Sequence, residues 1–211
     1  MTDTRANTVT VALADLHLAL SAIIPFANED GQSPGDFYAL HLAAGDGQLT
    51  ASATDGYVAG RASKPASGQL DAPFHVARTH AQLLCSALEF HLDVLSTMPV
   101  TLTVTDPWPT RLLTIRVDLS FTLTVYDQVV MPANMDRVFT TPPDEAPSAA
   151  GRTPLSADRI APFEHVAALA KGEPLQWTLF GPARRGYVRL GDWFTGVLMP
   201  VSPETKAVTY R

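Results

Sequence analysis

The feature that most constrains the fold of this chain is a pattern that occurs three times along it. Each occurrence has apolar residues at helical spacing, followed by three short segments in which apolar and polar residues alternate. The first predicts a helix from Asp15 to Ile24, then strands within residues 37–63 separated by Gly-Asp-Gly and Thr-Asp-Gly turns. The second predicts a helix at residues 78–90 and β-branched strands within residues 100–127. A further strand is expected before each of these helices, at residues 8–12 and 72–77.

The third occurrence has shorter connections. Residues 155–172 predict a helix in which Ser156 is the N-cap and Gly172 ends the helix, while Pro162 bends the helix or delays its start. Three strands are expected after it, at residues 175–181, 186–192 and 194–200. The whole is predicted to be an α+β fold, with antiparallel sheets covered on one face by a few helices.

A segment rich in Pro, Ala and Ser, TTPPDEAPSAAGRTP, separates the second and third occurrences and is typical of an exposed linker. We therefore divide the chain into two βαβββ units at residues 1–140, a linker at 141–153 and a third βαβββ unit at 154–211.

Composition narrows the functional classes. A chain that is 46% hydrophobic and 17% charged can bury a core. No window reaches the ~18 apolar residues of a membrane helix, and the N-terminus lacks a signal-peptide layout, so we expect a cytoplasmic protein with no membrane partner. The net charge of −6 disfavours coating of nucleic acid by overall charge. Basic residues outnumber acidic ones only from Arg152 onward, however, and a basic stripe on an acidic body stays open.

Catalytic and metal-binding patterns are missing from the sequence. The histidines, His17, His41, His75, His80, His91 and His165, form no HExxH or Cys/His spacing, and the single Cys85 is interpreted as a buried structural thiol. There is no GxSxG, P-loop or GxGxxG motif. Asp55 could act as a general base, but an Asp before Gly usually bonds its own turn. We expect no enzyme, metal or cofactor, and keep an unrelated hydrolase as a distant alternative.

Three further motifs, SATDGYVAGRA, MPANMDRVF and the closing FTGVLMPV, occur in that order within the repeats. Their order and spacing resemble those of the bacterial DNA sliding clamp, the β subunit of the replicative polymerase, over most of the chain. The resemblance implies sheets on the outside and helices lining an inner face. It also implies that residues 154–211 correspond to the C-terminal half of a clamp domain.

In sliding clamps these three motifs converge on a surface pocket that accepts a short linear peptide from polymerases, clamp loaders and repair proteins. A Met lining such a pocket is flexible and polarisable, which suits several ligands. Carried onto this sequence, the pocket comprises Tyr57, Val58, Ala59, Pro132, Val138, Leu198, Met199, Pro200 and Val201. The alternative interpretation is that residues 198–201 simply end a core strand.

The resemblance also implies a ring around double-stranded DNA. Rings of this family hold twelve such units, so three units per chain would close a homotetramer, with a trimer or dimer as alternatives. Contacts with DNA would be independent of base sequence and sensitive to salt, because basic side chains meet phosphates. The candidates are Arg61, Lys64, Arg78, Arg159, Lys171, Arg184 and Arg185, with Arg189 near the last two.

Two functions therefore compete. The first is a ring-forming processivity factor that tethers a polymerase. The second is a clamp-derived adaptor or competitor that binds the same peptides without encircling DNA, which is favoured by the scarcity of Lys and Arg on the predicted helices.

Overall fold

The computed structural model describes residues 7–29, 39–106, 111–117, 122–127, 135–140, 155–180 and 184–199. Its helices are α1 (Leu13–Ile23), the short 3-10 helix η1 (Ile24–Phe26), α2 (Arg78–Leu95), α3 (Met135–Phe139) and α4 (Ala157–Leu169). Its strands are β1 (Asn7–Ala12), β2 (Ala39–Gly45), β3 (Gln48–Thr54), β4 (Val58–Gln69), β5 (Phe74–Ala77), β6 (Pro99–Thr105), β7 (Leu112–Arg116), β8 (Thr122–Tyr126), β9 (Gln176–Leu179), β10 (Gly186–Leu190) and β11 (Phe194–Leu198).

The predicted repetition is present in this order. Strand, helix and three strands occur twice, as β1 to β4 and as β5 to β8, and α4 followed by β9 to β11 forms the third occurrence. The strand that would open a third βαβββ unit falls before α4, at residues 141–154, which lie outside the described residues. The linker expected at residues 141–153 lies outside the described residues.

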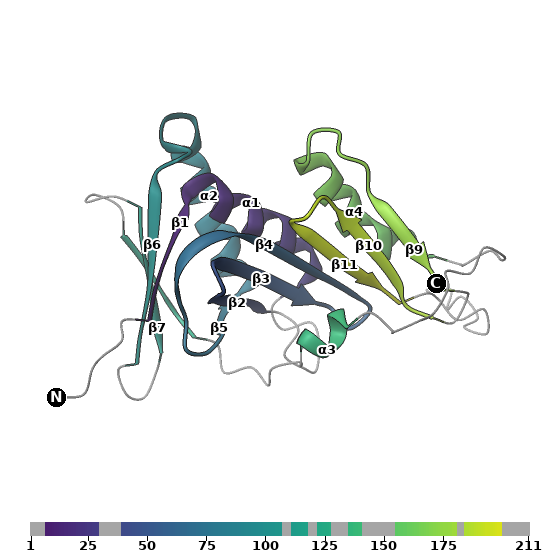
Figure 1. Cartoon of the computed structure of the whole chain (residues 1–211), viewed down its shortest axis with the longest axis horizontal. Coiled ribbons are helices and arrows are strands. Elements are labelled where there is room, and N and C mark those ends of the chain that lie inside the picture. Colours follow the sequence, from purple (N-terminus) through teal and green to yellow (C-terminus); the bar gives the residue numbers. More distant parts are fainter. Residues whose placement is uncertain are drawn as a thin grey trace, which may run out of the picture.

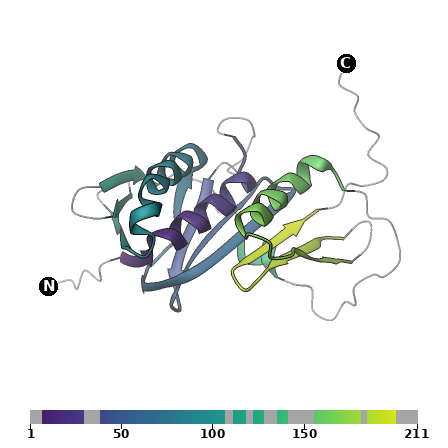
Figure 2. The same ribbon diagram turned by 90° about the horizontal axis from the view of Figure 1, so that it is seen from above.

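The sheet is antiparallel throughout and its helices gather on one face. Strands follow the order β5-β2-β3-β4-β1-β6-β7-β8, and β11, β10 and β9 continue from β4. Figure 1 shows this run of strands, and Figure 2 shows α1, α2 and α4 together along one side of it. The short α3 instead packs with Ala59, Tyr187 and Val197 on the opposite face. The predicted class, antiparallel sheet with helices on one face, is confirmed.

Strand β4 joins the two halves of this sheet because it changes neighbours along its length. Residues 58–62 pair with β11, whereas residues 66–69 pair with β1. Gly68 makes the second pairing possible: its φ of +92° favours glycine, and a Cβ there would collide with the carbonyl oxygen of Thr8 on β1. A single strand thereby holds the third repeat and the first repeat in one sheet.

The main core lies between the sheet and the helices. Where β4 meets β11, Gly60 and Gly196 face each other in register. A Cβ on Gly60 would lie 2.7 Å from the ring of Phe26, and a Cβ on Gly196 would collide with the ring of Phe163. The two glycines therefore make room for two rings, whose centroids lie 5.1 Å apart at 75°.

Helix α4 begins where the sequence predicted, one residue after Ser156. The Ser156 carbonyl accepts hydrogen bonds from the amides of Arg159 and Ile160, but its side chain makes no capping bond. Pro162 is buried inside the helix and does not delay its start. Gly172, with a φ of +104°, follows the helix end as expected.

No helix in the described part of the chain is long and apolar enough to cross a membrane.

Candidate functional site

A cavity of about 320 Å³ opens on the sheet face that carries α3, where β4 begins and β11 ends. Its walls come from three segments far apart in the sequence: the turn before β4, helix α3, and the ends of β10 and β11. The lining residues are Thr54, Gly56, Tyr57, Val58, Ala59, Val138, Arg185, Val197 and Met199.

The Thr-Asp-Gly turn is built to expose the aromatic residue that follows it. Oδ1 of Asp55 accepts hydrogen bonds of 2.7 Å from the amides of both Tyr57 and Val58. The Thr54 hydroxyl donates to the Val58 carbonyl at 2.7 Å and accepts from the Gly56 amide at 3.0 Å. Since the turn satisfies its own polar groups, Tyr57 is free to project outward, and it is 57% exposed. Asp55 is thus a structural residue of the turn.

Three contacts hold the end of β11 against this turn. The Met199 amide donates to the Tyr57 carbonyl at 2.8 Å. Arg159, from the first turn of α4, donates to the Met199 carbonyl at 2.8 Å, and its guanidinium carbon lies 4.2 Å from the centroid of the Tyr57 ring. Met199 itself is 38% exposed at the cavity. The apolar side chains of the wall are therefore fixed by backbone bonds while remaining open to solvent.

Helix α3 closes the other side of the cavity. Val138 lies in the lining, and its carbonyl accepts a hydrogen bond of 3.4 Å from Arg185. The Tyr187 hydroxyl donates to the Thr140 carbonyl at 2.9 Å, just after the helix ends. Arg185, just before β10, and Tyr187 in β10 thus hold α3 and the residue that follows it in place.

The structure brings together most of the predicted pocket residues that it describes. Tyr57, Val58, Ala59, Val138 and Met199 all line this one cavity. Leu198 does not: it is fully buried in the main core, because successive residues of a strand point to opposite faces. The remaining predicted residues, Pro132, Pro200 and Val201, lie outside the described residues.

Sequence reasoning missed several members of the site. Val197 could have been found from strand alternation, since it is two residues before Met199. Arg159 and Arg185 were assigned to DNA instead, and no local signal in the sequence distinguishes the two roles. Their placement depends on how α4 and β10 pack beside the turn.

Two of the predicted DNA-facing cations make contacts within the chain. Lys64 lies 3.8 Å from a carboxylate oxygen of Asp15 on α1 and over the ring of Trp193. Arg78 starts α2, but it donates to the Ala27 carbonyl at 2.8 Å. Both side chains are therefore engaged within the chain.

Arg61 lies on the opposite face of the sheet from the helices. Its neighbours Gly60 and Ala62 point toward the helical core, so alternation directs Arg61 toward α3, where it pairs with Asp136 at 2.8 Å. This position disagrees with the prediction that Arg61 joins an inner, helix-lined surface. Of the other candidates, Arg159 and Arg185 adjoin the cavity, and Lys171 and Arg184 are exposed.

Burial shifts the pKa values of several side chains, among them His41 and Cys85. Burial, followed by the charge of His75 at the neighbouring β5 position, lowers the pKa of His41 to about 4. Burial raises the pKa of the Cys85 thiol to about 11, which agrees with a structural cysteine. Within the described ranges, no three His, Cys, Asp or Glu side chains are grouped as a metal site.

Comparisons of sequence find no protein-family model and no curated protein that matches the chain. Comparison of structures does find proteins of similar fold. The DNA polymerase sliding clamp of Pseudomonas aeruginosa aligns over 92% of this chain and 65% of its own, with a TM-score of 0.70 and 13% identity. The C. crescentus beta sliding clamp aligns over 95% and 68%, with a TM-score of 0.69 and 16% identity.

The chain has the sliding-clamp fold. The DNA polymerase III beta subunit of Thermotoga maritima gives the same result, with a TM-score of 0.64 at 14% identity and coverage of 97% of this chain. The chain spans about two thirds of the length of each of these clamps. At such low identity the likeness establishes the clamp fold, and the activity and partners of the chain require separate argument.

Proposed function

We propose that this protein is a DNA sliding clamp, a processivity factor that holds polymerase or other partners through the cavity between β4, β11 and α3. The observation that carries the proposal is the convergence of three separated segments on one open, mostly apolar cavity in a chain with the clamp fold. The cavity is the right size for one or two side chains of an extended peptide. No catalytic role is assigned to any residue.

Peptide docking can be tested by titration with a fluorescent peptide that carries Gln, Leu and Phe anchors. Burial of one apolar anchor is worth ~1.5–3 kcal/mol, so a charge in the cavity should weaken binding tenfold or more. Met199→Asp and Val138→Asp are the test variants. Phe90→Asp is the matched control, because it introduces the same charge at an 85% exposed apolar position on α2, outside the cavity.

All variants must first show the thermal unfolding and oligomeric state of the parent. If folded Met199→Asp binds as tightly as Phe90→Asp, or if the parent binds no peptide, the docking function is wrong.

Ring assembly is the second part of the proposal, together with the division into residues 1–140, 141–153 and 154–211. Its support is that β5, β8 and β9, the terminal strands of the sheet, each pair with only one other described strand. Unpaired strand edges are normally covered, and neighbouring copies could cover these in a closed ring, with a tetramer favoured. Light scattering after size-exclusion chromatography tests this, and a monomer at micromolar concentration would exclude the ring.

DNA encirclement is the third part. Retention on closed circular duplex should exceed retention on the same duplex after linearisation, and direct contact should weaken steeply as salt rises. Equal retention on both forms would argue against a topological link.

A clamp-derived adaptor is a second candidate, and one observation favours it. On α2, the exposed positions include Leu83, Glu89, Phe90 and Asp93 rather than Lys or Arg, and Arg78 is bound to a backbone carbonyl. An adaptor would bind the peptide as a monomer or small oligomer and show no preference for circular DNA.

A further inference from the structure

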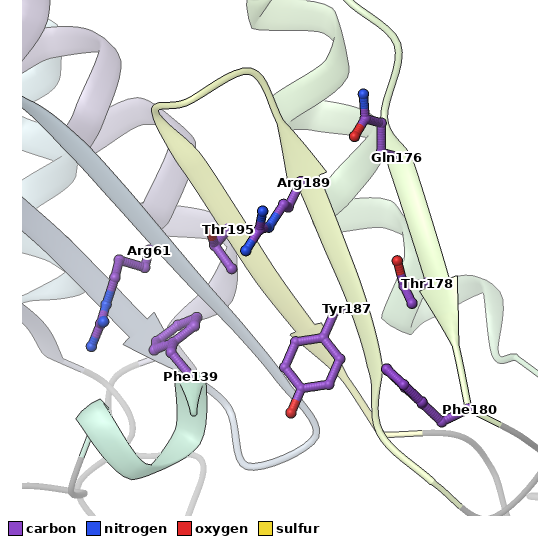
Figure 3. Close-up of a pocket in the computed structure, with 8 residues that line it drawn as sticks. All are labelled: Arg61, Phe139, Gln176, Thr178, Phe180, Tyr187, Arg189 and Thr195. Carbon is purple, nitrogen blue, oxygen red and sulfur yellow. The ribbon is translucent and has the colours of Figure 1, made fainter. Parts of the chain in front are cut away.

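A second cavity, of about 340 Å³, adjoins the first on the same face of the sheet. Its floor is a row of polar residues that face one another across four strands. In register, Arg61 of β4 lies opposite Thr195 of β11, Thr195 opposite Arg189 of β10, and Arg189 opposite Gln176 of β9. Figure 3 shows Arg189 directed from β10 across β11 toward Thr195, with Arg61 beyond it on β4. Both guanidinium groups thus line one cavity, Arg189 toward Thr195 and Arg61 beside Phe139 and Asp136 of α3.

The positive charge of this row is only partly balanced within the chain. Among the described residues, no carboxylate pairs with Arg189. Arg61 pairs with Asp136, whose side chain is 95% exposed, so water weakens that pair. Nε of Arg61 is buried without a hydrogen-bond partner. Although the net charge of the protein is −6, the row therefore carries local positive charge that can bind an anion.

The two cavities share one wall. Consecutive residues of α3 divide them, since Val138 lines the first and Phe139 lines the second. The floor is also continuous: the adjacent row across the strands runs from Ala59 through Val197, which line the first cavity, to Tyr187, which lines the second. Moving two residues along β11, from Val197 to Thr195, covers ~6.8 Å. An extended peptide in the first cavity therefore reaches the second within two to four residues.

We propose that this second cavity, here named the arginine cavity, binds an acidic side chain of the docked peptide between Arg61 and Arg189. The proposal rests on the peptide docking proposed above and adds a specificity: the preferred partner segment combines apolar anchors with a nearby Asp or Glu. A carboxylate suits the site because guanidinium groups donate to it in planar pairs. The Thr195 hydroxyl can donate a third hydrogen bond, and the Phe139 ring, 4.3 Å from the Arg61 guanidinium, holds that group in place.

The test compares matched peptides on matched variants. Fluorescent peptides carry the Gln, Leu and Phe anchors with a Glu two to four residues beyond either end, and each has a partner in which Gln replaces that Glu. On the parent, the best Glu peptide should bind about three- to tenfold more tightly than its Gln partner at low salt, and the ratio should fall at 0.5 M NaCl. Arg189→Gln should reduce the ratio to about one. Arg189→Lys should keep part of it.

Arg116→Gln is the control, because it removes one positive charge from β7, outside both cavities. It should leave the ratio unchanged. If the parent binds every Glu and Gln pair equally, or if Arg189→Gln preserves the preference, the arginine cavity has no such role while peptide docking stands. If the parent binds none of the peptides, the docking function and this inference both fail.

Discussion

Replacing Phe163 by alanine should weaken the packing of the third repeat against the first. The ring is fully buried and contacts the rings of Phe26, Trp177 and Phe194 edge-on, with centroids 5.1 to 6.4 Å away. A buried Phe→Ala change costs about 3–5 kcal/mol, part of it from the cavity that remains. Because Gly196 lies directly beneath the ring, position 196 has no side chain that could fill the space. We therefore expect a loss in the upper half of that range.

Urea unfolding measured by tryptophan fluorescence suits this experiment, since Trp177 contacts Phe163 and Trp193 contacts Phe194. The matched control is Phe90→Ala, which removes an exposed ring and should change the free energy of unfolding by less than about 0.5 kcal/mol. A loss below about 1 kcal/mol for Phe163→Ala, or one equal to that of the control, would refute the view that this ring cluster joins the repeats.

Three other changes give sharp expectations. Arg159→Gln removes the bond to the Met199 carbonyl and the contact with the Tyr57 ring, so peptide affinity should fall about two- to fivefold in titration; an unchanged Kd would mean that Arg159 does not shape the cavity. Since burial lowers the pKa of His41 to about 4, the unfolded chain binds a proton that the native state does not between about pH 6.5 and pH 4. The free energy of unfolding should therefore fall as the pH is lowered through this window, by up to ~1.4 kcal/mol per pH unit. In urea unfolding, the free energy of unfolding of His41→Gln should depend less steeply on pH than that of the parent; equal pH dependence in the two proteins would contradict this. Gly68→Ala should lower the free energy of unfolding by about 2 kcal/mol or more, and with it the melting temperature, because it places a Cβ at a positive φ and against the Thr8 carbonyl of β1. An unchanged melting temperature would argue against the pairing of β4 with β1 at this position.

The fold was predictable because its signals are local and repeated. Alternation and the Thr-Asp-Gly turn correctly mark the start of β11 at Phe194 and of β4 just after the turn, whereas β4 continues to Gln69, six residues beyond the predicted end. The pairing of β4 with β11 was not predictable from these signals, since no local pattern says which strands meet. The sequence likewise does not show that Gly60 and Gly196 face each other, because this depends on the register of β4 and β11.

The candidate site was predictable only in part, for a similar reason. Motif order brought Tyr57, Val138 and Met199 together correctly, whereas Leu198 was included because the motif was treated as a block rather than as an alternating strand. The positions of long basic side chains were still harder to predict. Arg61 and Arg159 reach neighbours far away in the sequence, and net charge alone does not indicate which face they occupy.

The first cavity exists only while the start of β4 and the end of β11 lie side by side, because each strand supplies part of its wall. A ligand seated there contacts both, and it cannot bind once β11 has detached. By mass action, such a ligand therefore stabilises the paired state of β4 and β11, raising the free energy needed to separate them by about 2.7 kcal/mol at a free ligand concentration one hundred times its Kd. Occupancy would then be readable as protection of the β4 and β11 amides against hydrogen exchange, without any label on the ligand.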